Sequence, residues 1–363
     1  MMQINKEDYN DGYYHFGKDF ESYPDAVIFI VWSRRGPGKT YSALRYPYHR
    51  FKTLYLKRTN KDVKTICEYD GDIDMDPSPW APLNRDFGIN VKPRLLKEGL
   101  GAFYDADPEG NPVGPVVNYV GSLNALKMLK GMDLSEAEWI ILDEFIPLAG
   151  EVVKRAEGEM LLDLYETVNR DRRKRGRPGL KLVLFANAEE ISTHITNALE
   201  VVETMADMQA SGQNIYFDQE RRILFHHITQ EDFPMQEIEL QDMARVMKGT
   251  AWADKAYGGM FSANDFSAVV KRSLKHFRCL YHIKFRRHND AYIYLSNKDG
   301  SYYMCSRPGN FIQSYDLDRE NQQKKFYFDH VLQLREACIN DRFQFEKYSY
   351  YDLIINYSKF FDL

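Results

Sequence analysis

Residues 27–40 read VIFIVWSRRGPGKT, and they indicate the type of fold most clearly. Its first five residues form a continuous β-branched and aromatic run, which is typical of a strand buried on both faces of a parallel sheet. A glycine-bearing turn follows, and residues 40–46 then favour a helix whose length Pro47 limits. A strand, a loop and a helix in this order predict a P-loop, in which backbone N–H groups curl around phosphate.

The loop departs from the usual pattern GxxxxGK[ST] at its first position, where Ser33 replaces glycine. Two later glycines supply the backbone freedom that the loop needs. We expect Lys39 to reach the phosphates and Thr40 to bind Mg²⁺. The residues predicted to bind the nucleotide are Ser33, Arg34, Arg35, Gly36, Pro37, Gly38, Lys39, Thr40 and Tyr41.

An acidic pair follows a second apolar run, WIIL at residues 139–142. ATP hydrolysis needs two carboxylates in different roles. We expect Asp143 to hold the Mg²⁺ shell and Glu144 to orient or deprotonate the attacking water. A glycine-rich turn alone can arise by chance, and an acidic pair alone can cap a strand. Their combination predicts a hydrolytic site with a Walker A loop and a Walker B strand.

Two further groups complete the predicted site. Asn187 follows the apolar run at residues 181–185, so it should lie at the carboxyl edge of the sheet and sense the γ-phosphate or position water. The alternative is an ordinary turn residue. Arg170 ends a helical segment and is a candidate arginine finger, acting in cis or on a neighbouring subunit. Its alternative is a solvated basic loop, because seven basic residues lie within residues 170–181.

Repeated strand and helix units predict an α/β fold with a parallel sheet. We expect a P-loop NTPase domain of the ASCE or RecA-like type over residues 1–230, with an insertion at residues 71–120 that contains a loop and a hairpin. Residues 231–265 are interpreted as a connector or lid. Residues 266–363 predict a smaller α+β domain with alternating strands.

Composition places the 363-residue chain among ordinary globular proteins, at 44% hydrophobic and 14% aromatic residues. It shows neither an apolar run near the ~20 residues of a membrane-spanning helix nor a signal peptide, so we expect a cytosolic protein without a membrane partner. Four scattered cysteines argue against a zinc site and a disulfide framework. The net charge of -5 is unevenly spread, since a second basic stretch within residues 271–287 is interleaved with aromatic residues.

Five segments together resemble the DNA-packaging ATPases of phi-29-like tailed phages, which are relatives of terminase large subunits. They are VWSRRGPGKTYSALRYPYHRF (residues 31–51), LYLKR (54–58), IILDEFI (140–146), ETVNRDR (166–172) and FANA (185–188). The resemblance is specific over residues 26–200. It implies the same roles for the loop, for Asp143 with Glu144, and for Arg170 as a finger on the neighbouring subunit, while Arg35 matches the arginine of the family's P-loop. The catalytic candidates are therefore Glu144, Arg170, Arg35 and Asn187.

The resemblance also implies cofactors and partners. ATP and Mg²⁺ are the cofactors. The family forms a homomeric ring, expected to be a pentamer, which docks on the portal (connector) of an empty procapsid in the host cell cytoplasm and threads double-stranded DNA through its channel. Some members dock through a structural packaging RNA, which makes such an RNA a further candidate partner.

Terminase large subunits also carry a domain of ribonuclease H type, which cuts DNA with metal ions held by several carboxylates. The candidate strands here, RCLYHIKF (residues 278–285) and AYIYL (291–295), contain no Asp or Glu, and Asp290 and Asp299 should lie in turns. We therefore expect a vestigial nuclease-like domain whose basic surface holds nucleic acid without cutting it.

Other classes of protein fit parts of the pattern. A GTPase should show NKxD downstream of the P-loop, whereas the one match, NKED at residues 5–8, lies upstream. A small-molecule kinase does not need both the acidic pair and the arginine-rich helix end, and a binding module would use ATP only to hold its shape. We expect a packaging motor, with a helicase-like translocase as the nearest alternative.

Overall fold

The computed structural model describes residues 13–68, 76–125, 129, 134–148, 150–151, 153–170, 172–229, 242–250, 253, 261, 264, 266–285 and 289–361. The chain divides into two units, Met1–Leu199 with Met208–Ser262 and Glu200–Asp207 with Ala263–Leu363. Most of the predicted connector, residues 231–265, lies outside the described residues. None of the helices found within these ranges has the length and apolar character needed to cross a membrane.

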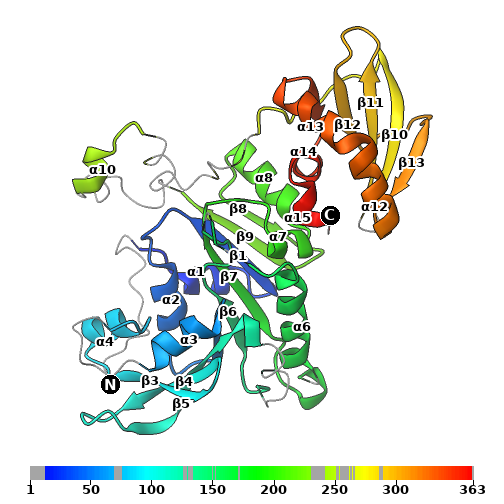
Figure 1. Cartoon of the computed structure of the whole chain (residues 1–363). Helices are drawn as coiled ribbons and strands as arrows, with labels where there is room; N and C mark the ends of the chain where they lie inside the picture. Colours follow the sequence, from blue (N-terminus) through cyan, green and yellow to red (C-terminus); the bar gives the residue numbers. More distant parts are fainter. Residues whose placement is uncertain are drawn as a thin grey trace. The chain divides into compact units, whose positions relative to one another are not determined.

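A nine-stranded sheet forms the centre of the first unit, in the order β3-β4-β5-β2-β6-β7-β1-β9-β8 (Figure 1). Its strands are β1 (Ile28–Ser33), β2 (Thr53–Lys57), β3 (Val91–Lys97), β4 (Leu100–Ala106), β5 (Pro112–Ser122), β6 (Trp139–Leu142), β7 (Lys181–Asn187), β8 (Ile215–Asp218) and β9 (Ile223–Ile228). The six strands from β5 to β9 in this order pair in parallel, whereas β3, β4 and β8 pair antiparallel. The predicted parallel α/β sheet is confirmed.

Helices cover both faces of this sheet (Figure 1). The helices of the first unit are α1 (Phe16–Ser22), α2 (Lys39–Arg45), α3 (Asn60–Cys67), α4 (Ala81–Phe87), α6 (Glu157–Asn169), α7 (His194–Ala198), the last part of α8 (Val202–Ser211) and α10 (Asp242–Val246), with short 3₁₀ turns at Leu123–Ala125 and Arg173–Arg175. Side chains of α1, α2 and α3 share one buried cluster with Phe29, Tyr55 and Phe185 of the sheet. Because the side chains of a strand alternate between its faces, the intervening residues such as Ile30 are buried on the other side.

The segment expected to be an insertion belongs in part to the main sheet. Its hairpin is confirmed, since β4 and β5 pair antiparallel around the turn at residues 107–111. The end of β5, however, pairs in parallel with β2, in the register Leu54 to Tyr119. The long strand β5 therefore belongs to both the hairpin and the parallel part of the sheet. Helix α4 precedes this hairpin in the chain. Residues 69–75 lie outside the described residues.

The second unit has a five-stranded sheet in the order β13-β10-β11-β12-β14. Its elements are β10 (Phe277–Phe285), β11 (Asn289–Ser296), β12 (Tyr302–Cys305), β13 (Gln313–Asp316), α12 (Glu320–Phe326), a π-helical turn (Tyr327–Val331), α13 (Leu332–Ile339), β14 (Phe343–Phe345), α14 (Tyr348–Ile355) and α15 (Tyr357–Phe360). Aromatic residues near the end of the chain, such as Phe345 and Tyr357, are fully buried in its core. They serve packing, as the sequence predicts.

One expectation for this unit is wrong. Asp290 lies within β11 rather than in a turn, because β11 begins at Asn289 and pairs with β10 from its first residue. The Asp290 carboxylate lies 3.1 Å from Nε2 of His282 on the neighbouring strand. Asp299 does lie in a turn. The ribonuclease H type of this unit stays a prediction.

Candidate active site

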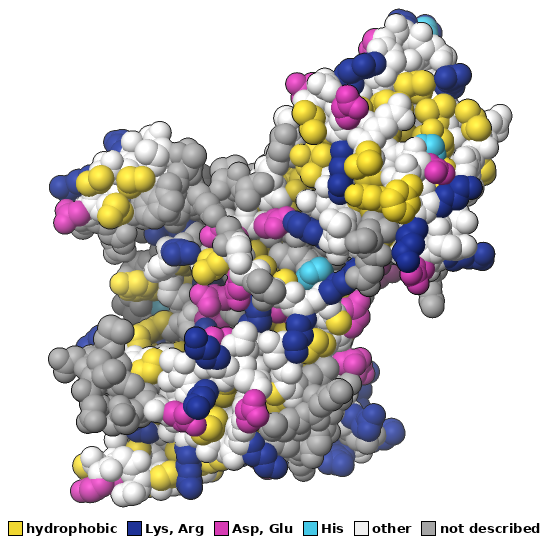
Figure 2. Space-filling model, in the orientation of Figure 1, with side chains coloured by type: hydrophobic (Ala, Val, Ile, Leu, Met, Phe, Trp, Pro, Cys, Tyr) yellow, Lys and Arg dark blue, Asp and Glu magenta, His cyan; other side chains and the backbone are white. Residues whose placement is uncertain are grey.

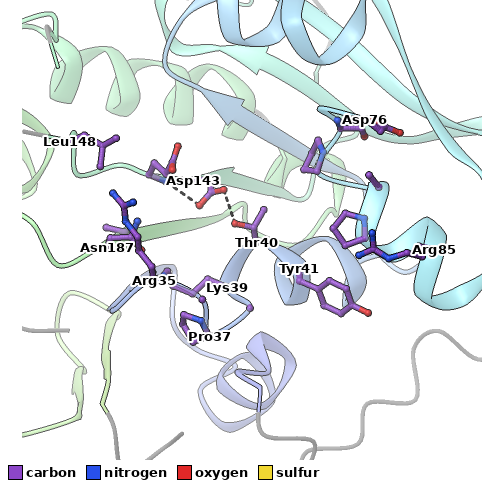
Figure 3. Close-up of a pocket in the computed structure, with 18 residues that line it drawn as sticks. Arg35, Pro37, Lys39, Thr40, Tyr41, Asp76, Arg85, Asp143, Leu148 and Asn187 are labelled. Atoms are coloured by element: carbon purple, nitrogen blue, oxygen red, sulfur yellow. Dashed lines mark hydrogen bonds between the residues drawn. The ribbon is translucent and has the colours of Figure 1, made fainter. Parts of the chain in front are cut away.

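A pocket of about 730 Å³ lies at the carboxyl edge of the first unit's sheet, where β1, β6 and β7 end (Figure 3). It brings together most of the predicted site residues: Arg35, Gly36, Pro37, Gly38, Lys39, Thr40, Tyr41, Asp143, Glu144 and Asn187. A second group of lining residues was not predicted: Asp76, Ser78, Pro79, Ala81, Pro82, Arg85, Leu148 and Ala186. Most of this second group belongs to α4 and the segment before it, where the sequence carries no phosphate-binding motif.

The loop between β1 and α2 turns through two left-handed glycines. Gly36 has φ of 91° and Gly38 has φ of 89°, a region that side chains with a Cβ rarely adopt. Ser33, in the position usually held by glycine, is fully buried at the end of β1. Its carbonyl accepts a hydrogen bond from the backbone N–H of Ala188 at 3.0 Å, which ties the loop to the end of β7.

The Lys39 ammonium is buried at the base of the pocket. It donates hydrogen bonds to Ser33 Oγ, to the Arg34 carbonyl at 3.2 Å and to Asn187 Oδ1 at 3.3 Å. Burial lowers the pKa of Lys39 to about 8, and the nearby Asp143 carboxylate opposes this shift. Asn187 lies at the carboxyl edge of the sheet, as expected, and contacts Lys39, the lysine predicted to bind phosphate.

Thr40 and Asp143 meet directly. Thr40 Oγ1 donates a hydrogen bond to Asp143 Oδ2 at 2.7 Å, drawn as a dashed line in Figure 3. The Tyr55 hydroxyl donates to the same oxygen at 2.9 Å, and burial raises the pKa of Tyr55 so that it stays protonated. A hydroxyl and a carboxylate at this separation fit a Mg²⁺ ion that takes its other ligands from phosphate and water. Among the residues that the structure describes, no group of three or more His, Cys, Asp or Glu could hold a metal ion.

Glu144 has a strained backbone. Its φ of 56° places a non-glycine residue in the left-handed region, at a cost of roughly 1–3 kcal/mol. Its side chain is 57% exposed, so its carboxylate can meet a water molecule in the pocket. Lys57 Nζ, at the end of β2, lies 3.6 Å from Glu144 Oε2 and 3.9 Å from Asp143 Oδ2. Strain at a pocket residue is typical of functional sites.

Arg58 holds the backbone that follows β6. Its guanidinium donates to the carbonyls of Glu144 at 3.2 Å and Phe145 at 3.1 Å. The same group is buried against Glu157 at 2.6 Å and Glu151 at 3.1 Å. The sequence does not reveal that Arg58 holds this backbone, because the partners of Arg58 lie 86 to 99 residues away.

The structure does not bring Arg170 to the pocket of its own chain. Arg170 follows the last residue of α6, whose 13 residues extend about 20 Å from the end near Arg58 toward the amino edge of the sheet. Figure 2 shows Lys and Arg side chains gathered at the lower right of the first unit, where α6 ends in Figure 1. Arg170 is exposed there, with Arg173 and Arg175.

Two other arginines are placed differently. Arg172 lies in the basic run for which a solvated loop was the alternative interpretation, but it is 1% exposed. It donates to the carbonyls of Ser135 at 2.7 Å and Ala137 at 2.6 Å, so it fixes the segment before β6. Arg35, at the pocket mouth, is 63% exposed, and its Nη2 lies 4.0 Å from Glu189 Oε1.

Comparison with known proteins identifies solved structures with the same fold. No protein-family model matches the sequence, and no curated protein matches it. The bacteriophage Phi-29 viral genome packaging motor assembly contains a chain with 16% identity and a TM-score of 0.60, covering 96% of this chain and 98% of that one. The Phi-28 gp11 DNA packaging motor matches with 16% identity and a TM-score of 0.55, covering 96% of both chains. The chain therefore has the fold of these two motor proteins.

Removal of the Arg58 guanidinium should destabilise the folded protein. Arg58→Met leaves Glu157, which is 3% exposed, charged and unpaired, so the free energy of unfolding should fall by about 3–5 kcal/mol. The double variant Arg58→Met/Glu157→Gln should regain much of this loss. Urea denaturation followed by tryptophan fluorescence measures both.

The matched control is Lys52→Met, which breaks an exposed ion pair with Glu136. It should change the free energy of unfolding by less than about 1 kcal/mol. Equal losses for Arg58→Met and Lys52→Met would contradict the anchoring role of Arg58.

Proposed function

We propose that this chain is an ATPase that drives double-stranded DNA into an empty viral capsid. The observation that carries the proposal is the pocket that joins the P-loop to the Asp143–Glu144 pair. The pocket occurs in a chain whose fold follows packaging-motor proteins along 96% of its length. A nucleoside triphosphate is the ligand for which a P-loop, a hydroxyl, and two carboxylates in separate roles are suited.

The chain's own residues bind and orient the nucleotide. Backbone N–H groups of the loop at Gly36 and Gly38 surround the phosphates, and Lys39 exchanges its protein oxygens for phosphate oxygens. Thr40 and Asp143 would hold Mg²⁺, which would supply positive charge to neutralise the phosphates of the nucleotide. Arg35, exposed at the pocket mouth, adds a further positive charge that can move toward the phosphates.

Glu144 acts on the attacking water. Its exposed carboxylate accepts the proton of the water or orients it, and the strained backbone held by Arg58 fixes its direction. Asn187 lies beside Lys39, where its amide can contact the γ-phosphate or the water. In this proposal Lys39 and Thr40 bind the nucleotide, and Glu144 acts in the hydrolysis step.

The motor assembly is part of the same proposal. We propose a homomeric ring, a pentamer, that docks on the capsid portal in the host cytoplasm, with a structural packaging RNA as a candidate third partner. The second unit is a vestigial nuclease-like domain. Its exposed basic residues, including Lys271, Lys275 and Arg278, contact nucleic acid through the phosphate backbone.

Variants of Lys39 and Glu144 should separate binding from chemistry. Lys39→Ala should abolish ATP binding or turnover, because it removes the charge that faces the phosphates. Glu144→Gln should bind ATP with near-normal affinity and hydrolyse it about 100-fold or more slowly, because the carboxylate acts on water. Calorimetry and a phosphate-release assay measure the two quantities.

The control is Lys18→Ala on α1, an exposed lysine outside the pocket, which should change neither quantity. Full ATP turnover in Lys39→Ala would show that the loop at residues 33–40 takes no part in ATP hydrolysis. Loss of ATP affinity with normal turnover in Glu144→Gln would contradict the role of Glu144.

Arg170 should act on the neighbouring subunit, since α6 places it away from its own pocket. Arg170→Ala should bind ATP normally, and its turnover should fall by about 10³-fold or more. The adjacent exposed Arg173→Ala is the control and should retain most of its turnover. Mixing Arg170→Ala with Glu144→Gln subunits should restore part of the turnover, because the Glu144→Gln neighbour supplies an intact finger. Mixtures that never recover, or a fully active Arg170→Ala protein, would rule out a trans finger.

The second unit should not cut DNA. A supercoiled plasmid incubated with the full chain and Mg²⁺ or Mn²⁺ should stay intact, because two-metal cleavage needs several acids converging on the metal ions. Nicking that disappears in Asp290→Ala or Asp299→Ala would show that this unit is an active nuclease.

A further inference from the structure

A second cavity, of about 480 Å³, adjoins the P-loop on the side of α2 and α4. It shares Gly38, Tyr41 and Pro82 with the first pocket, so the two cavities adjoin. We propose that this cavity binds the adenine base of the nucleotide. Aromatic side chains from three separate segments line it: Tyr13, Tyr41 and Phe87. This inference rests on the proposed ATPase function and adds the residues that read the base.

The cavity is fixed to the phosphate-binding loop by direct contacts. The backbone N–H of Tyr14 donates to the Pro37 carbonyl at 2.9 Å, and the N–H of Phe16 donates to Ser42 Oγ at 2.7 Å. The Tyr13 ring lies against the loop, since a Cβ built on Gly38 would be 3.4 Å from Tyr13 Cδ1. A nucleotide with its phosphates on the loop therefore has its base within reach of Tyr13.

The side chains that line the cavity are of the kinds on which a base can stack. Tyr41 and Phe87 have ring centroids 6.4 Å apart, and the Arg45 guanidinium lies 4.7 Å from the Phe87 centroid. Tyr13 is 55% exposed, which is unusual for a large aromatic side chain beside a binding loop. Bases stack on aromatic and guanidinium surfaces because both present flat, polarisable faces.

A carboxylate supplies the polar contact. Asp86 Oδ2 accepts a hydrogen bond from the Tyr41 hydroxyl at 3.0 Å, which fixes the Tyr41 ring and places an acceptor at the cavity wall. An ionised carboxylate only accepts hydrogen bonds, and the 6-amino group of adenine donates them. Asp86 therefore suits the amino edge of the base.

Helix α4 thereby becomes part of the nucleotide site. It provides Pro82 to both cavities, Arg85 to the phosphate pocket and Phe87 to the base cavity. It contacts α2, the helix that follows the P-loop. Helix α4, which lies within the segment that the sequence presents as an insertion, thus forms one wall of the nucleotide site.

The test compares ATP with inorganic tripolyphosphate, which has the phosphates and no base. Isothermal titration of the full chain should show ATP binding weakened about tenfold or more by Tyr13→Ala and by Phe87→Leu, because each removes a stacking ring. Tripolyphosphate affinity should stay unchanged in both variants. Tyr13 is exposed, so its loss should not disturb folding, and Phe87→Leu keeps an apolar side chain in the wall. Tyr216→Ala, at a 39% exposed tyrosine on β8, is the control and should change neither affinity.

Three outcomes would overturn the inference. Unchanged ATP affinity in both variants would show that the cavity does not hold the base. Equal weakening of ATP and tripolyphosphate would show that the aromatic residues act only through the loop. If the wild-type protein bound tripolyphosphate as tightly as ATP, the cavity would not contribute to binding, while the phosphate-binding role of the P-loop would stand. If the wild-type protein bound neither ligand, the nucleotide site as a whole would be wrong.

Discussion

The hydrogen bond from Thr40 to Asp143 is the contact on which the site depends. The two residues are 103 positions apart in the chain. They meet because β1 and β6 flank β7 and all three strands run in parallel, so that the P-loop, the acidic pair and Asn187 emerge at one edge of the sheet. If one of these strands ran the other way, its polar residues would lie at the opposite edge, about 15 Å or more away.

The acidic pair also depends on a constraint that the sheet alone does not supply. The chain turns sharply after β6, and Glu144 adopts a left-handed conformation that most side chains avoid. Arg58 compensates by donating hydrogen bonds to the successive carbonyls of Glu144 and Phe145 and by pairing with the buried Glu157. The turn separates the roles of neighbouring carboxylates, since it directs Asp143 to Thr40 and leaves Glu144 open to water.

The parts of the fold with a local pattern could be predicted, and the parts set by distant partners could not. The strand before the P-loop and the strand before Asp143 are continuous apolar runs, so both are visible in the sequence. Strand β9 (ILFHHI) pairs directly with β1, yet two histidines interrupt its apolar pattern. His226 is buried because Nδ1 lies 2.7 Å from Asp19, which is 207 residues away. Arg58, Arg172 and Phe87 likewise acquire their roles only from long-range contacts.

We expect ATP hydrolysis in this pocket to be coupled to the entry of DNA into a capsid. The most direct test measures ATP hydrolysis by the purified full chain with double-stranded DNA alone, with empty capsids alone, and with both. We expect slow hydrolysis by the chain on its own and a large increase when DNA and capsids are both present, because in the proposed ring each site receives the arginine of its neighbour. Hydrolysis that is the same with and without DNA and capsids would contradict this expectation.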